Sequence, residues 1–190
     1  MDTEEEVKDN RGNIHTITIF DFDDTLFHSS EHQGEFQPIP ELSETVLELL
    51  KSAAKKDSQT YIVTNASGSW VDSILQTCLK DILDVFHMFT KVISARDLNT
   101  SKEQIFAVLV TRHRPKQLIS FGDAPTDRAA ALYVEKMFPH VRVKSILTTQ
   151  TPPLDILIDQ HRYIIQHFDA IYNHQLRLDN SIMIGEKYSD

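Results

Sequence analysis

Four aspartates follow short apolar stretches that are typical of β-strands. Asp21 and Asp23 directly follow the first such stretch, and Asp123 and Asp127 follow a later one. In a parallel sheet the ligand binds beyond the carboxyl ends of the strands, so these side chains are expected to share one crevice. Carboxylates gathered there repel one another unless a cation holds them, and a site with oxygen ligands alone favours Mg²⁺.

The spacing of Asp21 and Asp23 suits two different chemical tasks. Residues two apart on a strand can face the same side. One carboxylate can attack a phosphorus atom, while the other donates a proton to the leaving oxygen and later takes one from water. Thr64 ends another apolar stretch and can grip phosphate oxygens, and the Lys102 ammonium can offset their charge.

Each of these residues, taken singly, also has a purely structural interpretation. An aspartate after a strand often caps a helix or forms a turn, a threonine suits a strand end, and a lysine at a helix start is usually solvated. The structural interpretation weakens when all of them converge on one crevice.

The elements that would position these residues follow from the pattern of apolar side chains. Five strands are expected at residues 15–20, 60–63, 91–95, 117–121 and 141–147. Helices are expected between them, including one long helix from Trp70 to Phe86, one opened by a capping box at Thr100 and Glu103, and a last one to about residue 172. Strands alternating with helices predict an α/β fold, a three-layer doubly wound parallel sheet.

The 190 residues fit one domain, which we place at residues 14–176 between a flexible acidic arm (1–13) and a C-terminal tail (177–190). The charge of −9 argues against a nucleic-acid partner. No apolar run approaches the roughly 18–20 residues of a membrane span, and the start lacks a secretory signal. A lone cysteine, Cys78, excludes an internal disulfide. These features predict a cytoplasmic protein without integral membrane association, and leave export by a signal-independent route open, as for a bacterial effector.

Four segments then occur in order along the chain: Asp21-Phe22-Asp23-Asp24-Thr25 after a strand, Val63-Thr64-Asn65, Lys102, and Gly122-Asp123-Ala124-Pro125-Thr126-Asp127. In this order they resemble the four motifs of the haloacid dehalogenase (HAD) superfamily, over residues 15–150. The resemblance implies the three-layer fold of that superfamily, with Asp21 as nucleophile and Asp23 as general acid and base.

The resemblance also implies the residues that bind the substrate and the metal. Thr64, Asn65 and Lys102 would bind the phosphate. Mg²⁺ would be held by the Asp21 carboxylate, the Asp23 backbone carbonyl and Asp123, with Asp127 in or beside the metal shell. Asp24 matches no chemical role and is interpreted as a turn or surface carboxylate.

The acid at Asp23 favours a phosphatase over a dehalogenase, because a halide leaves without a proton whereas an alkoxide or phenoxide needs one. Only 32 residues separate Phe27 from Thr60, and 36 separate Asn65 from Lys102, which is too few for an inserted cap domain. An open site suits a phosphorylated protein side chain. Phosphotyrosine is slightly favoured, because Trp70 and the segment 27–36 could supply aromatic walls.

Two alternatives remain: a phosphatase of small metabolites such as sugar phosphates or nucleotides, and a non-catalytic binding module with the same fold. Three other side chains near these motifs receive structural interpretations. His28 and His32 are expected to be exposed to solvent, and His161 is expected to be a hydrogen-bonded core or edge residue.

Overall fold

The protein is described from a computed structural model, which covers residues 14–32, 34, 36–55, 57–182 and 184. The described chain forms one parallel sheet with the strand order β3-β2-β1-β4-β5-β6. Its strands are β1 (Thr16–Phe20), β2 (Ser58–Thr64), β3 (Lys91–Ser94), β4 (Gln117–Gly122), β5 (Arg142–Leu147) and β6 (Leu178–Ser181).

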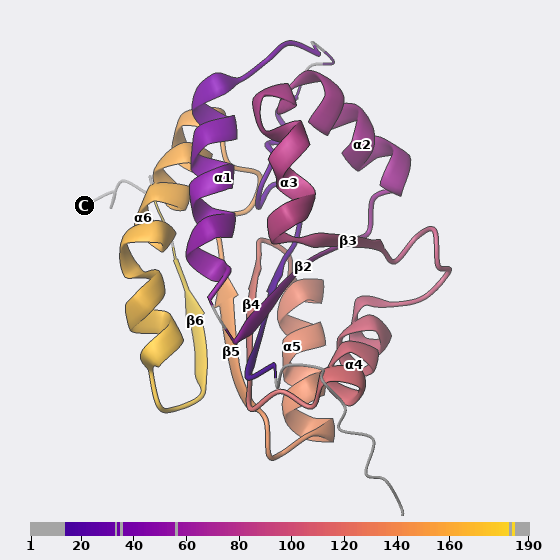
Figure 1. Ribbon diagram of the computed structural model, residues 1–190, viewed down its shortest axis with the longest axis vertical. Helices are drawn as coiled ribbons and strands as arrows, with labels where there is room; N and C mark the ends of the chain where they lie inside the picture. Colours follow the sequence, from indigo (N-terminus) through magenta and orange to yellow (C-terminus); the bar gives the residue numbers. More distant parts are fainter. Residues whose placement is uncertain (1–13, 33, 35, 56, 183, 185–190) are drawn as a thin grey trace, which may run out of the picture.

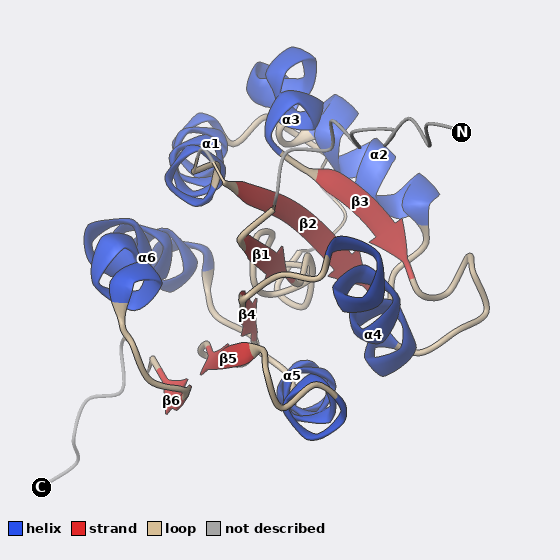
Figure 2. Ribbon diagram, turned by 60° about the horizontal axis from the view of Figure 1, so that its bottom comes forward, coloured by secondary structure: helices blue, strands red, loops and turns tan. Residues whose placement is uncertain are grey.

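Helices cover both faces of the sheet, as Figures 1 and 2 show. On one face lie α1 (Pro40–Ala53), α2 (Gly68–Thr77), a short 3₁₀ helix (Lys80–Ile82), α3 (Leu83–Phe89) and α6 (Leu154–Asn173). On the other lie α4 (Lys102–His113) and α5 (Pro125–Met137). The predicted three-layer α/β fold with a parallel sheet is confirmed.

The central strand β1 joins the two hydrophobic cores that lie on opposite faces of the sheet. Its side chains alternate, so that Phe20 packs under α1 and α6 while Ile17 and Ile19 pack under α4 and α5. Phe20 stacks on Phe121 of the neighbouring strand, with ring centroids 5.0 Å apart. All five residues of β1 are buried, Thr16 and Thr18 included, as expected for a central parallel strand that helices cover on both faces.

Two predicted elements differ from those in the structure. The expected helix from Trp70 to Phe86 is three pieces, α2, the 3₁₀ helix and α3, although their apolar residues share one core. The predicted tail contains a sixth strand, β6, which pairs in parallel with β5. Its sequence, Leu-Asp-Asn-Ser, is polar and mostly exposed at the sheet edge, so it lacks the apolar pattern that marks a buried strand. The predicted arm (1–13) and residues 183 and 185–190 lie outside the described residues.

Between β1 and α1 the described residues form a loop, and between β2 and β3 they form the α2–α3 segment, so no cap domain is present among them. In the same part of the chain, no helix combines the length and apolar character needed to cross a membrane.

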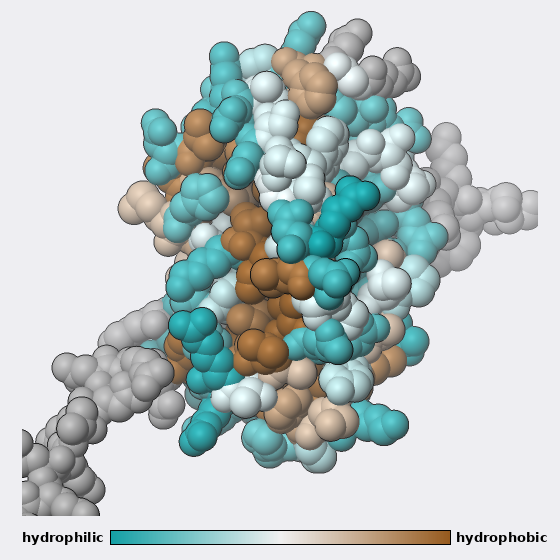
Figure 3. Space-filling view, turned by 90° about the vertical axis from the view of Figure 1, so that its right-hand side faces the viewer, coloured by the Kyte–Doolittle hydropathy of each residue, from teal (hydrophilic) through white to brown (hydrophobic). Residues whose placement is uncertain are grey.

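The opposite edge of the sheet is formed by β3 and faces the viewer in Figure 3. On this side of the molecule, apolar side chains form a band flanked by hydrophilic ones. A groove of about 690 Å³ lies beside this strand, between Val92 and Ile93 on one hand and Gly68, Asp72 and His87 on the other. None of the seven predicted site residues is among its described lining residues.

Candidate functional site

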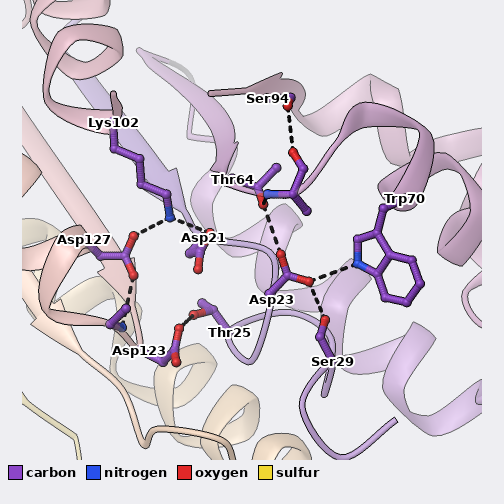
Figure 4. A network of polar contacts seen from close by, with 12 residues as sticks. Asp21, Asp23, Thr25, Ser29, Thr64, Trp70, Ser94, Lys102, Asp123 and Asp127 are labelled. Atoms are coloured by element: carbon purple, nitrogen blue, oxygen red, sulfur yellow. Dashed lines mark hydrogen bonds and ion pairs between the residues drawn. The ribbon is translucent and has the colours of Figure 1, made fainter. Parts of the chain in front are cut away.

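Six of the seven predicted site residues converge at the carboxyl edge of the sheet, around the ends of β1, β2 and β4 (Figure 4). These two strands pair with Phe20 opposite Phe121, and the Asp21 backbone N–H donates to the Phe121 carbonyl at 2.9 Å. Asp21 and Asp123 therefore leave neighbouring strands at nearly the same level. The strand order reverses beside β1, which is where ligands bind in open α/β sheets.

Lys102 links two of the aspartates through a buried charge network. Its Nζ lies 2.7 Å from Asp21 Oδ1 and 2.5 Å from Asp127 Oδ1, and all three side chains are buried. Lys102 is the first residue of α4, and the N-cap of this helix is Ser101, whose Oγ accepts from the Gln104 backbone N–H at 3.3 Å. The cap is thus one residue later than the predicted Thr100.

Asp127 has partners on both of its carboxylate oxygens. Oδ1 meets Lys102, and Oδ2 accepts from the Ala124 backbone N–H at 3.1 Å, which fixes the first turn of α5. Gly122 makes this possible, since a Cβ there would lie 2.3 Å from Asp127 Cγ. The glycine before Asp123 is required by the close approach of Asp127, so it is a structural part of the site.

Three carboxylates gather around one ammonium group in this part of the site. One carboxylate oxygen from each of Asp21, Asp123 and Asp127 lies within 4.8 Å of one from each of the others. Lys102 is the only cation in contact with them among the described residues, so a surplus of negative charge remains. An all-oxygen donor set with surplus negative charge fits a hard divalent cation, so this group could hold a metal ion.

The ionisation of these groups reflects their crowding. Burial raises the pKa of the Asp21 carboxyl, the nearby Lys102 charge opposes this rise, and the Asp127 carboxylate adds to it. Burial raises the pKa of Asp123 to about 6, with further contributions from the Asp127 and Asp24 carboxylates. Burial disfavours the charge on Lys102, but Asp21 and Asp127 together outweigh it and hold the pKa of Lys102 above its usual value.

Asp23 lies in a second part of the site, where three donors hold its carboxylate. Thr64 Oγ1 donates to Asp23 Oδ2 at 3.2 Å, while the Trp70 indole N–H (3.0 Å) and the Ser29 hydroxyl donate to Oδ1. The Thr64 hydroxyl in turn accepts from the Ala66 backbone N–H at 2.9 Å. The predicted acid and the predicted phosphate-binding hydroxyl are therefore in direct contact (Figure 4).

Asn65 is the one predicted residue that the structure does not connect to the others. It follows Thr64 but its side chain is exposed, and no hydrogen bond joins it to the described residues of the site. The other six predicted residues form two groups. Asp21, Asp123 and Asp127 gather near Lys102, and Asp23 contacts Thr64.

Asp24 shapes the loop after β1. The prediction that it is a turn residue is confirmed, whereas the prediction that it lies at the surface is wrong. Asp24 has a φ of 54° and is buried, and its carboxylate accepts from the Ser30 backbone N–H at 2.9 Å and from the Ser30 hydroxyl. These bonds offset the strain of a left-handed aspartate and close the loop that carries Ser29 to Asp23.

His161 supports the same loop from α6 and is a hydrogen-bonded core residue, as predicted. Its Nε2 donates to the Thr25 carbonyl at 2.8 Å, and its Nδ1 lies 3.0 Å from the Thr45 hydroxyl. Thr25 donates its own hydroxyl to Asp123 Oδ1 at 3.4 Å. The fully buried imidazole therefore joins α1, α6 and the acidic group.

The prediction that His28 and His32 are solvent-exposed is wrong. His28 is only 8% exposed and His32 is half-buried, because both pack on Phe27, at 4.7 and 5.1 Å between ring centroids. The closed loop, which no periodicity marks, turns them inward.

Sequence reasoning missed the roles of Ser29 and of the Trp70 indole N–H. A serine in an aperiodic loop has no sequence pattern that indicates its partner. The tryptophan six residues after Thr64 does indicate an aromatic side chain near the crevice, but not its hydrogen bond.

Comparisons of the chain with protein-family models and with curated proteins found no match.

Proposed function

We propose that the protein is a Mg²⁺-dependent phosphomonoester hydrolase that works through an aspartyl phosphate on Asp21. The observation that carries the proposal is the pairing of a buried, lysine-held aspartate with a second aspartate held by Thr64 two residues later. The ordered motifs that resemble the HAD superfamily support the same function, and a binding module would not require this second carboxylate.

In this proposal the Asp21 and Asp123 carboxylates and the Asp23 backbone carbonyl hold Mg²⁺, with Asp127 beside them. The fit rests on the clustered carboxylate oxygens and their surplus negative charge. When bound, Mg²⁺ supplies positive charge that offsets the repulsion between the phosphate and the aspartates.

The side chains divide the reaction into two steps. An Asp21 oxygen attacks phosphorus and the bond to the leaving oxygen breaks, while that oxygen takes a proton from Asp23. Water then attacks the phosphorus of the aspartyl phosphate, gives its proton to Asp23, and releases inorganic phosphate with Asp21 restored. Lys102 orients Asp21 and offsets charge, and the Thr64 hydroxyl binds a phosphate oxygen.

A phosphorylated side chain of a protein is the proposed substrate, since no cap covers the site among the described residues. A large substrate can reach such a site and exclude water by its own bulk.

The test is release of phosphate from para-nitrophenyl phosphate with Mg²⁺, with EDTA, and by the Asp123→Asn variant. We expect turnover with Mg²⁺, its loss with EDTA, and a strongly raised Mg²⁺ requirement in the variant. Thermal unfolding with and without Mg²⁺ gives a second readout, because a ligand that binds the folded state raises the melting temperature. A rise in melting temperature without phosphate release from any phosphomonoester would favour the binding module instead.

A further inference from the structure

The general acid marks where the leaving group must lie. Asp23 can protonate the leaving oxygen only from within hydrogen-bond distance of it. The group attached to that oxygen must then pass beside the side chains that surround Asp23. With Asp23 as the acid of the proposed function, on which this inference rests, the side chains around Asp23 contact the leaving group and select it.

A cluster of aromatic rings adjoins Asp23 through Trp70, where the loop after β1 meets α2. The Trp70 indole donates to Asp23 directly, and Figure 4 shows its ring extending away from the carboxylate. His32 and Phe36 each lie 6.3 Å from the Trp70 ring, and 5.3 Å from each other, between ring centroids. Phe27 lies beneath them, 6.4 Å from Trp70. We call Phe27, His32, Phe36 and Trp70 the aromatic wall.

The aromatic wall combines a fixed base with an exposed rim. Phe27 is fully buried. The rings of Phe27, His32 and Phe36 each meet the Trp70 ring edge-to-face. This packing geometry can accommodate the ring of a ligand in the same way. Phe36, in contrast, is 47% exposed, although its ring packs against those of Trp70 and His32. A large apolar side chain that is half exposed, and that packs on the ring donating to Asp23, is suited to pack on a ligand.

We infer that the substrate of this site is an aryl phosphate, whose ring packs on Trp70 and Phe36 while Asp23 protonates the phenolic oxygen. The chemistry is that of a tyrosyl phosphate, in a protein or as a free small molecule. A sugar or seryl leaving group would place hydroxyl and backbone groups against the Trp70 and Phe36 rings, which offer them no hydrogen bond because the Trp70 N–H is already given to Asp23.

The experiment separates ring packing from leaving-group acidity. Phenyl phosphate is compared with hexafluoroisopropyl phosphate, an alkyl ester whose alcohol is about as acidic as phenol. We expect the wild type to turn over phenyl phosphate with a kcat/KM at least about tenfold higher. Phe36→Ala should remove most of this preference by raising KM for phenyl phosphate, with kcat nearly unchanged.

Met137→Ala is the matched control. Met137 is 52% exposed and ends α5, the helix that begins at the site, so it lies at the far end of that helix. Its substitution should leave kcat/KM for both esters unchanged. A phosphotyrosine peptide measured beside free phosphotyrosine then distinguishes the two sources of the ring, since a higher kcat/KM for the peptide assigns a protein substrate.

Equal kcat/KM for the two esters in the wild type, or a preference that Phe36→Ala leaves intact, would overturn the inference and leave the phosphatase proposal standing. A protein that releases phosphate from none of the three substrates (phenyl phosphate, hexafluoroisopropyl phosphate and para-nitrophenyl phosphate) would overturn the proposed function itself.

Discussion

Lys102 and Asp21 form a buried ion pair of 2.7 Å between side chains 81 positions apart in the sequence. The contact joins the start of α4 to the end of the central strand. Because Lys102 also meets Asp127, one ammonium group holds two carboxylates that would otherwise repel each other in a buried environment.

Removal of this ammonium should destabilise the fold. Lys102→Met leaves Asp21 and Asp127 buried without their counter-charge, and we expect the free energy of unfolding to fall by about 3 kcal/mol. Urea denaturation at pH 7 measures the change. Lys55→Met is the matched control, since Lys55 pairs with Asp169 at the surface and its loss should cost less than about 1 kcal/mol. Similar losses in the two variants would contradict the buried network.

The Trp70 indole N–H should act on catalysis through Asp23. Trp70→Phe keeps an aromatic ring but removes the donor to Asp23 Oδ1, so the acid is less well positioned. We expect kcat for an alkyl phosphate to fall about tenfold, because its poor leaving group depends on proton transfer. Para-nitrophenyl phosphate barely needs the proton and should lose less than about twofold.

Asp23→Asn removes the acid altogether and gives the largest effect expected in this comparison. We expect kcat to fall about 10²-fold or more for the alkyl ester and by a smaller factor for para-nitrophenyl phosphate. Equal losses on both esters in either variant would assign that residue a structural role only.

His161 should make stability depend on pH. Burial lowers the pKa of His161 from 6.5 to about 4, against the opposing effect of its bond to the Thr25 carbonyl. Between these two values the unfolded chain binds a proton at this residue and the folded protein does not, so acidification favours unfolding. The contribution of His161 is complete above pH 6.5 and falls by about 3 kcal/mol as the pH is lowered to 4.

The measurement is the difference in unfolding free energy between the wild type and His161→Gln at several pH values. Asp21 and Asp123 titrate in both proteins, so their contributions largely cancel in the difference. We expect the advantage of the wild type to shrink steadily from pH 7 to pH 4. A difference that stays constant over this range would contradict a neutral, buried imidazole.

Much of the fold and of the site could be predicted from the sequence, because the same signal marks both. Buried parallel strands are continuous apolar runs, and their carboxyl ends must meet at one edge. Asp21, Thr64 and Asp123 stand directly at such ends, so their convergence follows from the strand pattern. Lys102 follows from the start of a helix after the third strand.

The rest depends on contacts that no periodicity encodes. The polar strand β6 forms at a sheet edge, where pairing with β5 replaces apolar burial as its cause. The burial of His28 depends on a loop closed by Asp24 and Ser30, and the link from Trp70 to Asp23 joins residues 47 positions apart. Side chains brought together by an aperiodic loop leave no trace in sequence spacing.

The central claim is that Asp21 attacks phosphorus, and turnover of para-nitrophenyl phosphate by Asp21→Asn tests it most directly. The amide keeps the shape of the carboxylate but cannot act as the nucleophile, so we expect a fall in kcat of about 10⁴-fold or more. Asp97→Asn should retain most of the activity, because this carboxylate lies outside the acidic group and accepts from the Gly68 backbone N–H at the start of α2. An Asp21→Asn protein that is folded and keeps more than about a tenth of the wild-type kcat would contradict the mechanism.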